Sequence, residues 1–471
     1  MTDTTDLAFT SAVRQAELVR NGDVTPSELV ELYLTRIDDL NPQLNAYVTV
    51  AADFARSAAR SAERQLASGD GDVAPFLGVP ISIKDLADTA DIVSTHGTAQ
   101  WNDRVPERDD EVVARIKAAG FVILGKTIVP EFGPLNVSEP PGYPPGRNPW
   151  DPTRSCGGSS GGAAAALAAG LCPVSHGSDG GGSIRNPAAW CGVFGLKPSR
   201  GRVSAAPAPQ QLFAINGPLA RTVADAAALL DVMAGYSTGD AWWAPSPDRW
   251  LLDEVGVEPG RLRVAFHPHP GVEPDAIEPA HRRAAEDTAA LLEGLGHLVV
   301  PTEPPVFGAE MLGQTAILFA VGHAAQAPNL PPLDTLDPWM KTMIEMGRLV
   351  SATDYAGALD AIQRRSREVV AFFDDYDVLL CPTVAQAPPK VGAMADASIE
   401  EMSTFFAMTP FTALWNTTGQ PAVTLPLAYD DAGLPVGVQL VGRPADEATL
   451  VRVSAQIENA SPWVGRRPPV S

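Results

Sequence analysis

The stretch from Ser155 to Ser178 constrains the fold more than any other, because it carries no formally charged residue although 19% of the chain is charged. Within it only Ala163 to Val174 reads as apolar. That segment is too short to cross a membrane, which takes roughly 20 apolar residues. We therefore expect a buried alanine-rich helix followed by a strand.

Helical and strand-like segments alternate on both sides of this stretch. The first 70 residues look helical, and Thr25-Pro26-Ser27-Glu28 forms a capping box with proline at the first helical position. Further strands are predicted at 79–83, 121–124, 262–266, 378–380, 422–425 and 436–440, and further helices at 110–119, 223–234, 282–295 and 448–459. Because no repeat or low-complexity linker interrupts the alternation, we expect one α/β fold with a central sheet.

Two regions lack this regular pattern. Residues 139–152 are rich in proline, and residues 301–340 mix prolines with short apolar runs that have no clear period. Irregular connections of this kind often select the substrate of an enzyme. A plain surface connection explains either region equally well.

The overall charge narrows the choice of partners. With a net charge of −22, the surface should repel phosphate backbones and anionic lipid. We therefore expect neither a nucleic acid nor a membrane as partner. The four cysteines form no CxxC pair, and five charged residues lie within the first twenty positions, so we expect a cytoplasmic location.

Two common motifs match in letters only. Residues 120–127 fit the P-loop pattern GxxxxGK[ST], but the four intervening residues are Phe, Val, Ile and Leu, which should form a buried strand. Residues 157–161 fit the nucleophile elbow GxSxG around Ser159, but the proline-containing segment 149–154 cannot supply the central strand that an elbow needs. His267 and His269 could form a metal pair, although solvated loop residues are the more frequent explanation.

Three other segments together indicate serine chemistry. GGSSGG spans 157–162, three glycines precede a serine in Ser178-Asp179-Gly180-Gly181-Gly182-Ser183-Ile184-Arg185, and an apolar strand ends on a lysine at Lys84. A serine needs an adjacent base to act as nucleophile. A buried lysine can be that base, because burial penalises its charged form and lowers its pKa. Each segment alone could be an ordinary turn or strand end.

These segments closely resemble the amidase signature family. The resemblance covers GVPISIKD from Gly78, GGSSGG, GGSIRNPA and GLKPSRGRVS, and a tail from Phe411 to Arg443 that includes NTTGQPAVTLPLA. It implies a single domain over 1–471 with a central mixed sheet flanked by helices. Within it we expect N-terminal helices at about 1–70, core motifs at 78–204, a variable substrate region at about 244–364 and a C-terminal core at about 404–460.

The resemblance also implies roles for individual residues. Lys84 matches the catalytic lysine, Ser159 the bridging serine that follows a cis peptide bond, and Ser183 the nucleophile. The oxyanion hole falls on the backbone amides of Gly180, Gly181, Gly182 and Ser183. The chemistry requires no metal or cofactor. Gly180 departs from the threonine that is common in the family, which leaves the loop less constrained.

The function expected from this resemblance is cleavage of a carbon–nitrogen acyl bond in a small-molecule amide or carbamate. Anilides, lactams, urethanes and esters are open to the same attack. The alternative is a glutaminase subunit of a tRNA-dependent amidotransferase, in which a glutamine commonly stands where this chain has Asn186. A non-catalytic binding protein is a third hypothesis, against which the presence of Lys84, Ser159 and Ser183 argues. The oligomeric state stays open, with a homodimer among the expectations.

Overall fold

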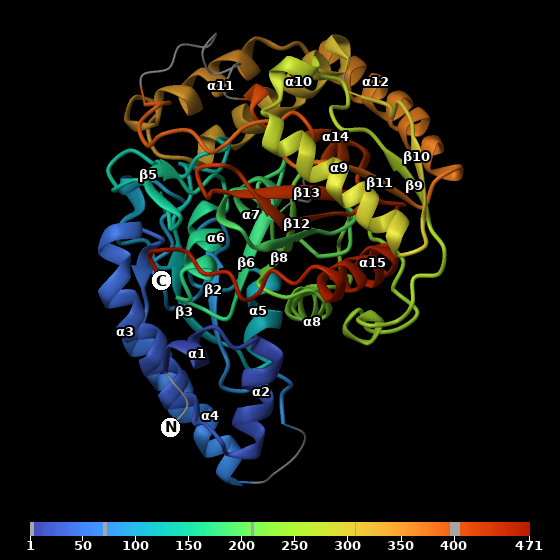
Figure 1. Ribbon diagram of the computed structural model, residues 1–471. Helices are drawn as coiled ribbons and strands as arrows, with labels where there is room; N and C mark the ends of the chain where they lie inside the picture. Colours follow the sequence, from blue (N-terminus) through green and yellow to red (C-terminus); the bar gives the residue numbers. More distant parts are fainter. Residues whose placement is uncertain (1–3, 69–72, 209–211, 307, 396–405) are drawn as a thin grey trace.

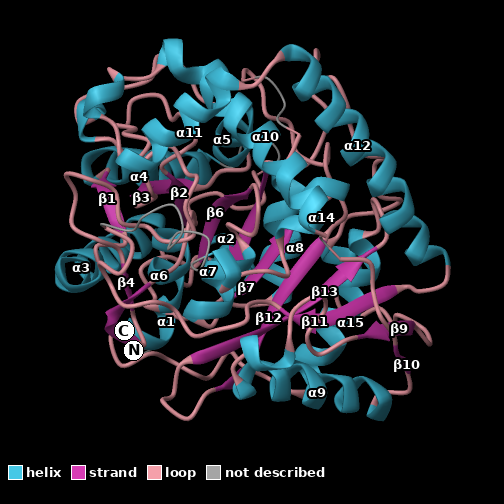
Figure 2. Cartoon of the chain, turned by 90° about the horizontal axis from the view of Figure 1, so that it is seen from above, coloured by secondary structure: helices cyan, strands magenta, loops and turns pink. Residues whose placement is uncertain are grey.

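A large mixed sheet runs through the computed structural model, which describes residues 4–68, 73–208, 212–306, 308–395 and 406–471 (Figure 1). Its eleven strands follow the order β1-β3-β2-β6-β8-β7-β12-β13-β11-β9-β10. Helices cover both faces of this sheet, which crosses the molecule from β1 to β10 in Figure 2. The chain is a single domain of the α/β class, as predicted.

The elements of this domain have the following bounds. The strands of the main sheet are β1 Tyr47–Val50, β2 Pro80–Lys84, β3 Val122–Thr127, β6 Val174–Asp179, β7 Phe194–Lys197, β8 Ile215–Ala220, β9 Arg263–Phe266, β10 Leu298–Pro301, β11 Val378–Pro382, β12 Ala422–Tyr429 and β13 Pro435–Gly442; β4 Arg147–Asn148 and β5 Asp151–Ser155 form a separate pair. The helices are α1 Thr4–Ala8, α2 Ala12–Asn21, α3 Pro26–Leu44, α4 Ala52–Ser68, α5 Glu111–Ala118, α6 Gly161–Ala168, α7 Arg185–Cys191, α8 Val223–Met233, α9 Pro279–Gly294, α10 Ala309–Gln326, α11 Pro338–Leu349, α12 Ala352–Ala371, α14 Ala413–Thr418 and α15 Glu447–Ala460.

The uncharged stretch lies at the centre of the fold, as expected. Every residue of α6 is buried, and β6 follows it as a strand of the main sheet. Two parallel neighbours, β2 and β3, lie on one side of β6. This arrangement brings the end of β2 and the end of β6 to the same edge of the sheet, because parallel strands finish together.

Most predicted elements are confirmed. The capping box at Thr25 is present in full, with the side chain of Thr25 accepting from the N–H of Glu28 and the carboxylate of Glu28 accepting from the N–H of Thr25. The P-loop look-alike is the buried strand β3. The segment before the elbow look-alike forms β5, outside the main sheet. Residues 1–3, 69–70, 307 and 404–405 of the predicted regions lie outside the described residues.

Two predictions are wrong. The first 70 residues, expected to be helical, also contain β1, which pairs with β3 at the edge of the main sheet. Residues 301–340, expected to be irregular, contain the helix α10. Its sequence AEMLGQTAILFAVGHAAQ is apolar on nearly every side, so it lacks the alternation of polar and apolar residues that marks an amphipathic helix. It also begins after Gly308 without a side-chain cap.

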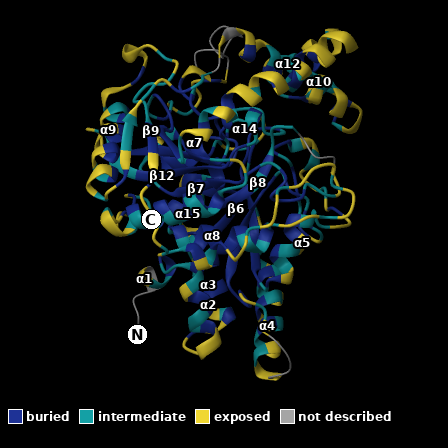
Figure 3. Ribbon diagram, turned by 90° about the vertical axis from the view of Figure 1, so that its right-hand side faces the viewer, coloured by how far each residue is buried: buried dark blue, intermediate teal, exposed yellow. Residues whose placement is uncertain are grey.

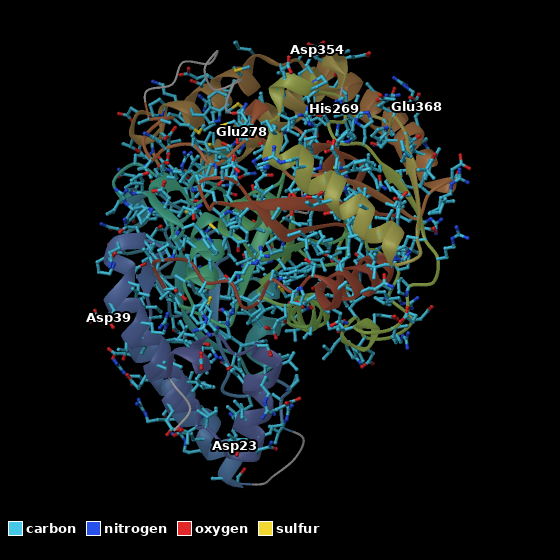
Figure 4. All side chains as sticks on the ribbon, in the orientation of Figure 1. Asp23, Asp39, His269, Glu278, Asp354 and Glu368 are labelled. Carbon is cyan, nitrogen blue, oxygen red and sulfur yellow. The ribbon has the colours of Figure 1, made fainter. Side chains whose placement is uncertain are left out.

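Buried and exposed residues occupy different parts of this molecule. Buried residues follow the sheet and its inner helices, while α10 and α12 carry much of the exposed surface (Figure 3). The labelled acidic residues Asp23, Asp39, Asp354 and Glu368 lie at the rim of the molecule (Figure 4). Among the helices of the described ranges, none combines the length and apolarity that crossing a membrane takes.

Candidate active site

Lys84 ends β2 inside the protein and points to the segment before α6. All five residues of β2 are buried, and Lys84 itself has no exposed surface. Its Nζ donates hydrogen bonds to Ser159 Oγ at 2.8 Å and to the carbonyl of Ser178 at 2.9 Å. Burial lowers the pKa of Lys84 to about 7, although the negative charge of Asp179 acts in the opposite direction. A lysine with this pKa is neutral in a large fraction of molecules at neutral pH.

Ser159 is held by a tightly packed glycine segment. The peptide bond between Gly158 and Ser159 is cis. A Cβ atom on Gly158 would lie 2.7 Å from the backbone nitrogen of Val137, so only glycine fits at this close approach. The sequence motif GGSSGG therefore reflects backbone contact with a neighbouring loop.

Ser183 lies beside Ser160, the residue that follows Ser159, through a backbone contact. The N–H of Ser160 donates to the carbonyl of Ser183 at 3.1 Å, which joins the start of α6 to the loop after β6. Ser183 is partly exposed, and its hydroxyl makes no hydrogen bond to another described residue. The structure thus brings the side chains of Lys84 and Ser159 into direct contact and places Ser183 in the adjoining loop. Hydrogen bonds of a catalytic relay are often long or unformed without substrate.

The amide groups around Ser183 do not all face the same way. Gly182 donates its N–H to Asp179 Oδ1 at 2.7 Å. The expected oxyanion hole needs correction at this residue, because an N–H already bonded to a buried carboxylate is not free for an oxyanion. The N–H groups of Gly180, Gly181 and Ser183 have no partner within the described part of the chain.

Comparison with known proteins settles the family. The model of the family described as Amidase matches residues 28–451. "Putative amidase AmiB2" of Mycobacterium tuberculosis (strain ATCC 25618 / H37Rv) is 41% identical, with both chains covered in full. The chain belongs to the amidase signature family. It is accordingly a hydrolase that acts on amides.

Solved structures agree with this family over almost the whole chain. A 6-aminohexanoate cyclic dimer hydrolase complexed with substrate superposes with a TM-score of 0.92 at 34% identity, covering 98% of this amidase and 99% of that chain. A bacterial aryl acylamidase of the amidase signature family gives a TM-score of 0.89 at 26% identity, with 97% of each chain covered. These likenesses do not favour the glutaminase-subunit alternative.

A buried polar network holds the amide loop of this amidase, which we define as residues 180–183. Asp179 and Arg185 form an ion pair at 2.9 Å with no exposed side-chain surface. Burial acts to raise the pKa of Asp179, but the attraction of Arg185 prevails and holds that pKa well below its usual range. Asn416 donates to Asp179 and accepts from Arg185 Nη2 at 2.6 Å. The network fixes the backbone of the loop by accepting from Gly182 and from the N–H of Ile184 at 3.1 Å.

The sequence analysis did not single out these supporting residues. A signal was available for Asp179 and Arg185, which have opposite charges, stand six residues apart and flank the three glycines. Asn416 lies 237 positions from Asp179, so no local pattern could have joined the two.

The nearest alternative, Ser159 as an elbow nucleophile with a histidine base, does not match the geometry. Among the described residues the side-chain partner of Ser159 is Lys84. His176 instead bonds Asn216 Oδ1 at 3.2 Å, and burial lowers the pKa of His176 to about 3. His267 follows β9, one of the two last strands of the main sheet, and contacts Glu303 Oε1 at 3.0 Å.

Proposed function

We propose that this amidase hydrolyses the carbon–nitrogen bond of amides through an acyl-enzyme on Ser183, with Ser159 and Lys84 as the proton relay. The observation that carries the proposal is the 2.8 Å hydrogen bond between Lys84 Nζ and Ser159 Oγ, made by a lysine without exposed surface. Its pKa of about 7 makes the neutral form available, and only that form accepts a proton.

The proposed reaction has two halves. Ser183 Oγ attacks the carbonyl carbon, and its proton passes through Ser159 Oγ to Lys84 Nζ. The oxyanion accepts hydrogen bonds from the N–H groups of Gly180, Gly181 and Ser183. When the intermediate collapses, the carbon–nitrogen bond breaks and the proton returns through Ser159 to the leaving nitrogen.

The second half frees the enzyme. Water attacks the acyl ester on Ser183, and its proton follows the same relay. Collapse of this second intermediate releases the carboxylic acid and returns the proton to Ser183. The residues named here complete the cycle without a metal or cofactor.

Small amides are the proposed substrates. The similarity to a cyclic dimer hydrolase and to an aryl acylamidase supports cyclic and aryl amides as the first candidates. Carbamates and esters expose the same carbonyl to attack, so urethane hydrolysis belongs to the proposal.

A substrate panel with a Ser183→Ala variant tests the proposal. The panel holds an aliphatic amide, an anilide, an aryl carbamate and glutamine. We expect the purified chain alone to cleave the anilide or the carbamate, and the variant to lose at least about 10⁴-fold in kcat. Hydrolysis that survives in Ser183→Ala would overturn the assignment of the nucleophile. Cleavage of glutamine alone would point to the glutaminase-subunit alternative.

We also infer a cytoplasmic location. All four cysteines are free thiols and buried in the described structure, which suits a reducing compartment. Cell fractionation with an antibody against the chain tests this inference. A homodimer stays a prediction that sedimentation velocity would check.

A further inference from the structure

Two chain segments flank the candidate active site, one on each side. A Cβ atom on Gly133 would lie 3.5 Å from Ser159 Oγ, so Gly133 lies next to the relay serine. A Cβ atom on Gly180 would lie 3.8 Å from the Cβ of Ala214, so Ala214 lies next to the amide loop. The neighbours of these contact points in the chain are Phe132 and Phe213, and both are partly exposed.

Each of these phenylalanines packs against the α10–α11 hairpin, which we define as residues 309–349. Phe213 stacks on Phe319 of α10 with ring centroids 4.7 Å apart and planes 7° from parallel. Phe132 packs on the cluster that contains Met340 and Ile344 of α11. In Figure 1 the hairpin lies at the top of the molecule, above the sheet.

The hairpin is firmly attached to this part of the site. The buried carboxylate of Glu131 accepts from the N–H of Asp337, the N-cap of α11, at 2.6 Å. A Cβ atom on Gly347 would lie only 2.0 Å from the carbonyl oxygen of Ala320, so α11 crosses α10 in direct backbone contact. The hairpin therefore presents its side chains at fixed positions.

Phe213 is anchored from the opposite side. Its carbonyl accepts from Asn416 Nδ2 at 3.1 Å, and the carbonyl of Leu212 accepts from Arg200 Nε at 2.8 Å. Asn416 belongs to the network that fixes the amide loop. The backbone of Phe213 is thus held in a defined position relative to Asp179 and the loop that follows it.

Charge is scarce along the wall that residues 212–216 and α10 form, whereas the segment 131–135 carries the buried carboxylate of Glu131, which is bonded to Asp337. Residues 212–216 read Leu-Phe-Ala-Ile-Asn, and the only formal charge in α10 is that of Glu310 in its first turn. Burial lowers the pKa of His323, so this side chain is neutral at physiological pH. A charged substrate group placed against this wall would lose hydration without gaining a partner, which is strongly unfavourable.

We propose that the stacked pair of Phe213 and Phe319 selects neutral amides whose acyl or leaving group is large and apolar. The inference rests on the proposed function and names the substrate class of the same site. Phe319 acts on the substrate by supporting the ring of Phe213 and by its own partly exposed side chain. It is therefore a specificity-determining residue and takes no part in the bond-breaking steps.

The test compares Phe319→Ala with the control Phe372→Ala. Phe372 is also partly exposed and also stacks at 4.7 Å, but on Tyr376. Two anilide series are measured, one with acyl groups from acetyl to octanoyl and one with aryl groups of increasing size, each with a carboxylate-bearing member. We expect wild type to prefer large neutral members. Phe319→Ala should lose about tenfold of that preference, through a higher KM for the large members.

The outcomes separate the two proposals. Equal losses on small and large amides, or the same change in Phe372→Ala, would overturn the role of the phenylalanine pair while leaving the proposed function intact. The rates at which fluorophosphonates with short and long alkyl chains label Ser183 measure the same preference for large groups without turnover. If Ser183 is not labelled and Ser183→Ala keeps its activity, the proposed function itself fails.

Discussion

At the residue scale, two glycines of the loop before Ser183 differ in what their surroundings allow. Gly182 has a φ of +128°, and a Cβ atom there would lie 2.3 Å from Thr412 Oγ1. The φ of Gly180 lies outside the left-handed region, and its nearest neighbour would be 3.8 Å away. Only Gly182 is therefore required by the structure, so the family's threonine could be accommodated at position 180.

A matched pair of alanine variants tests this difference. We expect Gly182→Ala to lower the free energy of unfolding by about 2 kcal/mol, because alanine is strained at this φ. Gly180→Ala should raise it by about 0.5 kcal/mol, because it restricts the unfolded chain. Urea denaturation measures both values. Equal destabilisation by the two variants would contradict the conclusion that the structure requires glycine at position 182 and not at position 180.

The second prediction at the residue scale concerns Lys84 and the pH dependence of kcat/KM. Because burial lowers its pKa to about 7, the fraction of neutral lysine rises as the pH increases through that value. We expect kcat/KM for a neutral anilide to rise over the same range and then level off. A pH profile of the wild-type enzyme measures this directly.

Lys84→Arg is the control for the pH profile. Arginine stays protonated at every pH of the experiment, so the variant should lose at least about 10³-fold in kcat/KM. A wild-type profile that falls as the pH rises through 7 would contradict the role of neutral Lys84 as base.

At the element scale, a buried ion pair fixes the end of β2 where Lys84 lies. Lys126 of β3 is 3.5 Å from Asp85, and neither side chain has exposed surface. Asp85 also accepts from the Thr95 N–H at 3.0 Å and from its hydroxyl, while Lys126 donates to Ser94 Oγ at 2.9 Å. The strand end is thus bound to the loop that follows it.

Removing one partner of this buried ion pair should strongly lower the free energy of unfolding. We expect Asp85→Asn to lower the free energy of unfolding by about 3–5 kcal/mol, since it leaves the charge of Lys126 buried without compensation. The double variant Asp85→Asn/Lys126→Met should recover part of that loss. Glu17→Gln, which breaks the exposed pair with Arg14, should cost less than about 1 kcal/mol in the same urea titrations. Similar losses for the buried and the exposed pair would contradict the argument.

At the scale of the whole molecule, Arg221 joins both ends of the chain to the core. Its guanidinium donates to the carbonyls of Ala8 at 3.1 Å and of Cys172 at 2.8 Å. Its own carbonyl accepts from Trp463 Nε1 at 2.8 Å. Trp463 is 5% exposed and lies parallel to Phe194 at 6.4 Å. The tail after α15 is therefore part of the core packing.

The burial of Trp463 predicts that its removal destabilises the whole fold. We expect Trp463→Ala to lower the free energy of unfolding by about 3–5 kcal/mol, because it opens a cavity in the main core. Trp243→Ala, at a side chain 62% exposed, should change it by less than about 0.5 kcal/mol. Thermal unfolding of both variants makes the comparison. A Trp463→Ala protein as stable as Trp243→Ala would contradict the structural role of the tail.

The sequence by itself determined the fold class, the family and the residues for which we propose catalysis. Strand and helix periods, caps and glycine motifs are local properties, and local backbone preferences express them directly. For this reason β2, β3 and β6 are predictable from the sequence, whereas the roles of Lys84 and Ser159 follow from the resemblance of their motifs to the amidase signature family. The same local rules missed α10, whose residues are apolar on nearly all sides.

The tertiary structure alone decided which groups meet. In it the N–H of Gly182 donates to Asp179, and Asn416, 237 positions away, donates to the same residue. Phe319 stacks on Phe213. Contacts of this kind depend on how the whole chain closes around the sheet, and no window of neighbouring residues contains them. The pKa of Lys84 belongs to the same class, because burial by many separate segments, and no single neighbour, sets it.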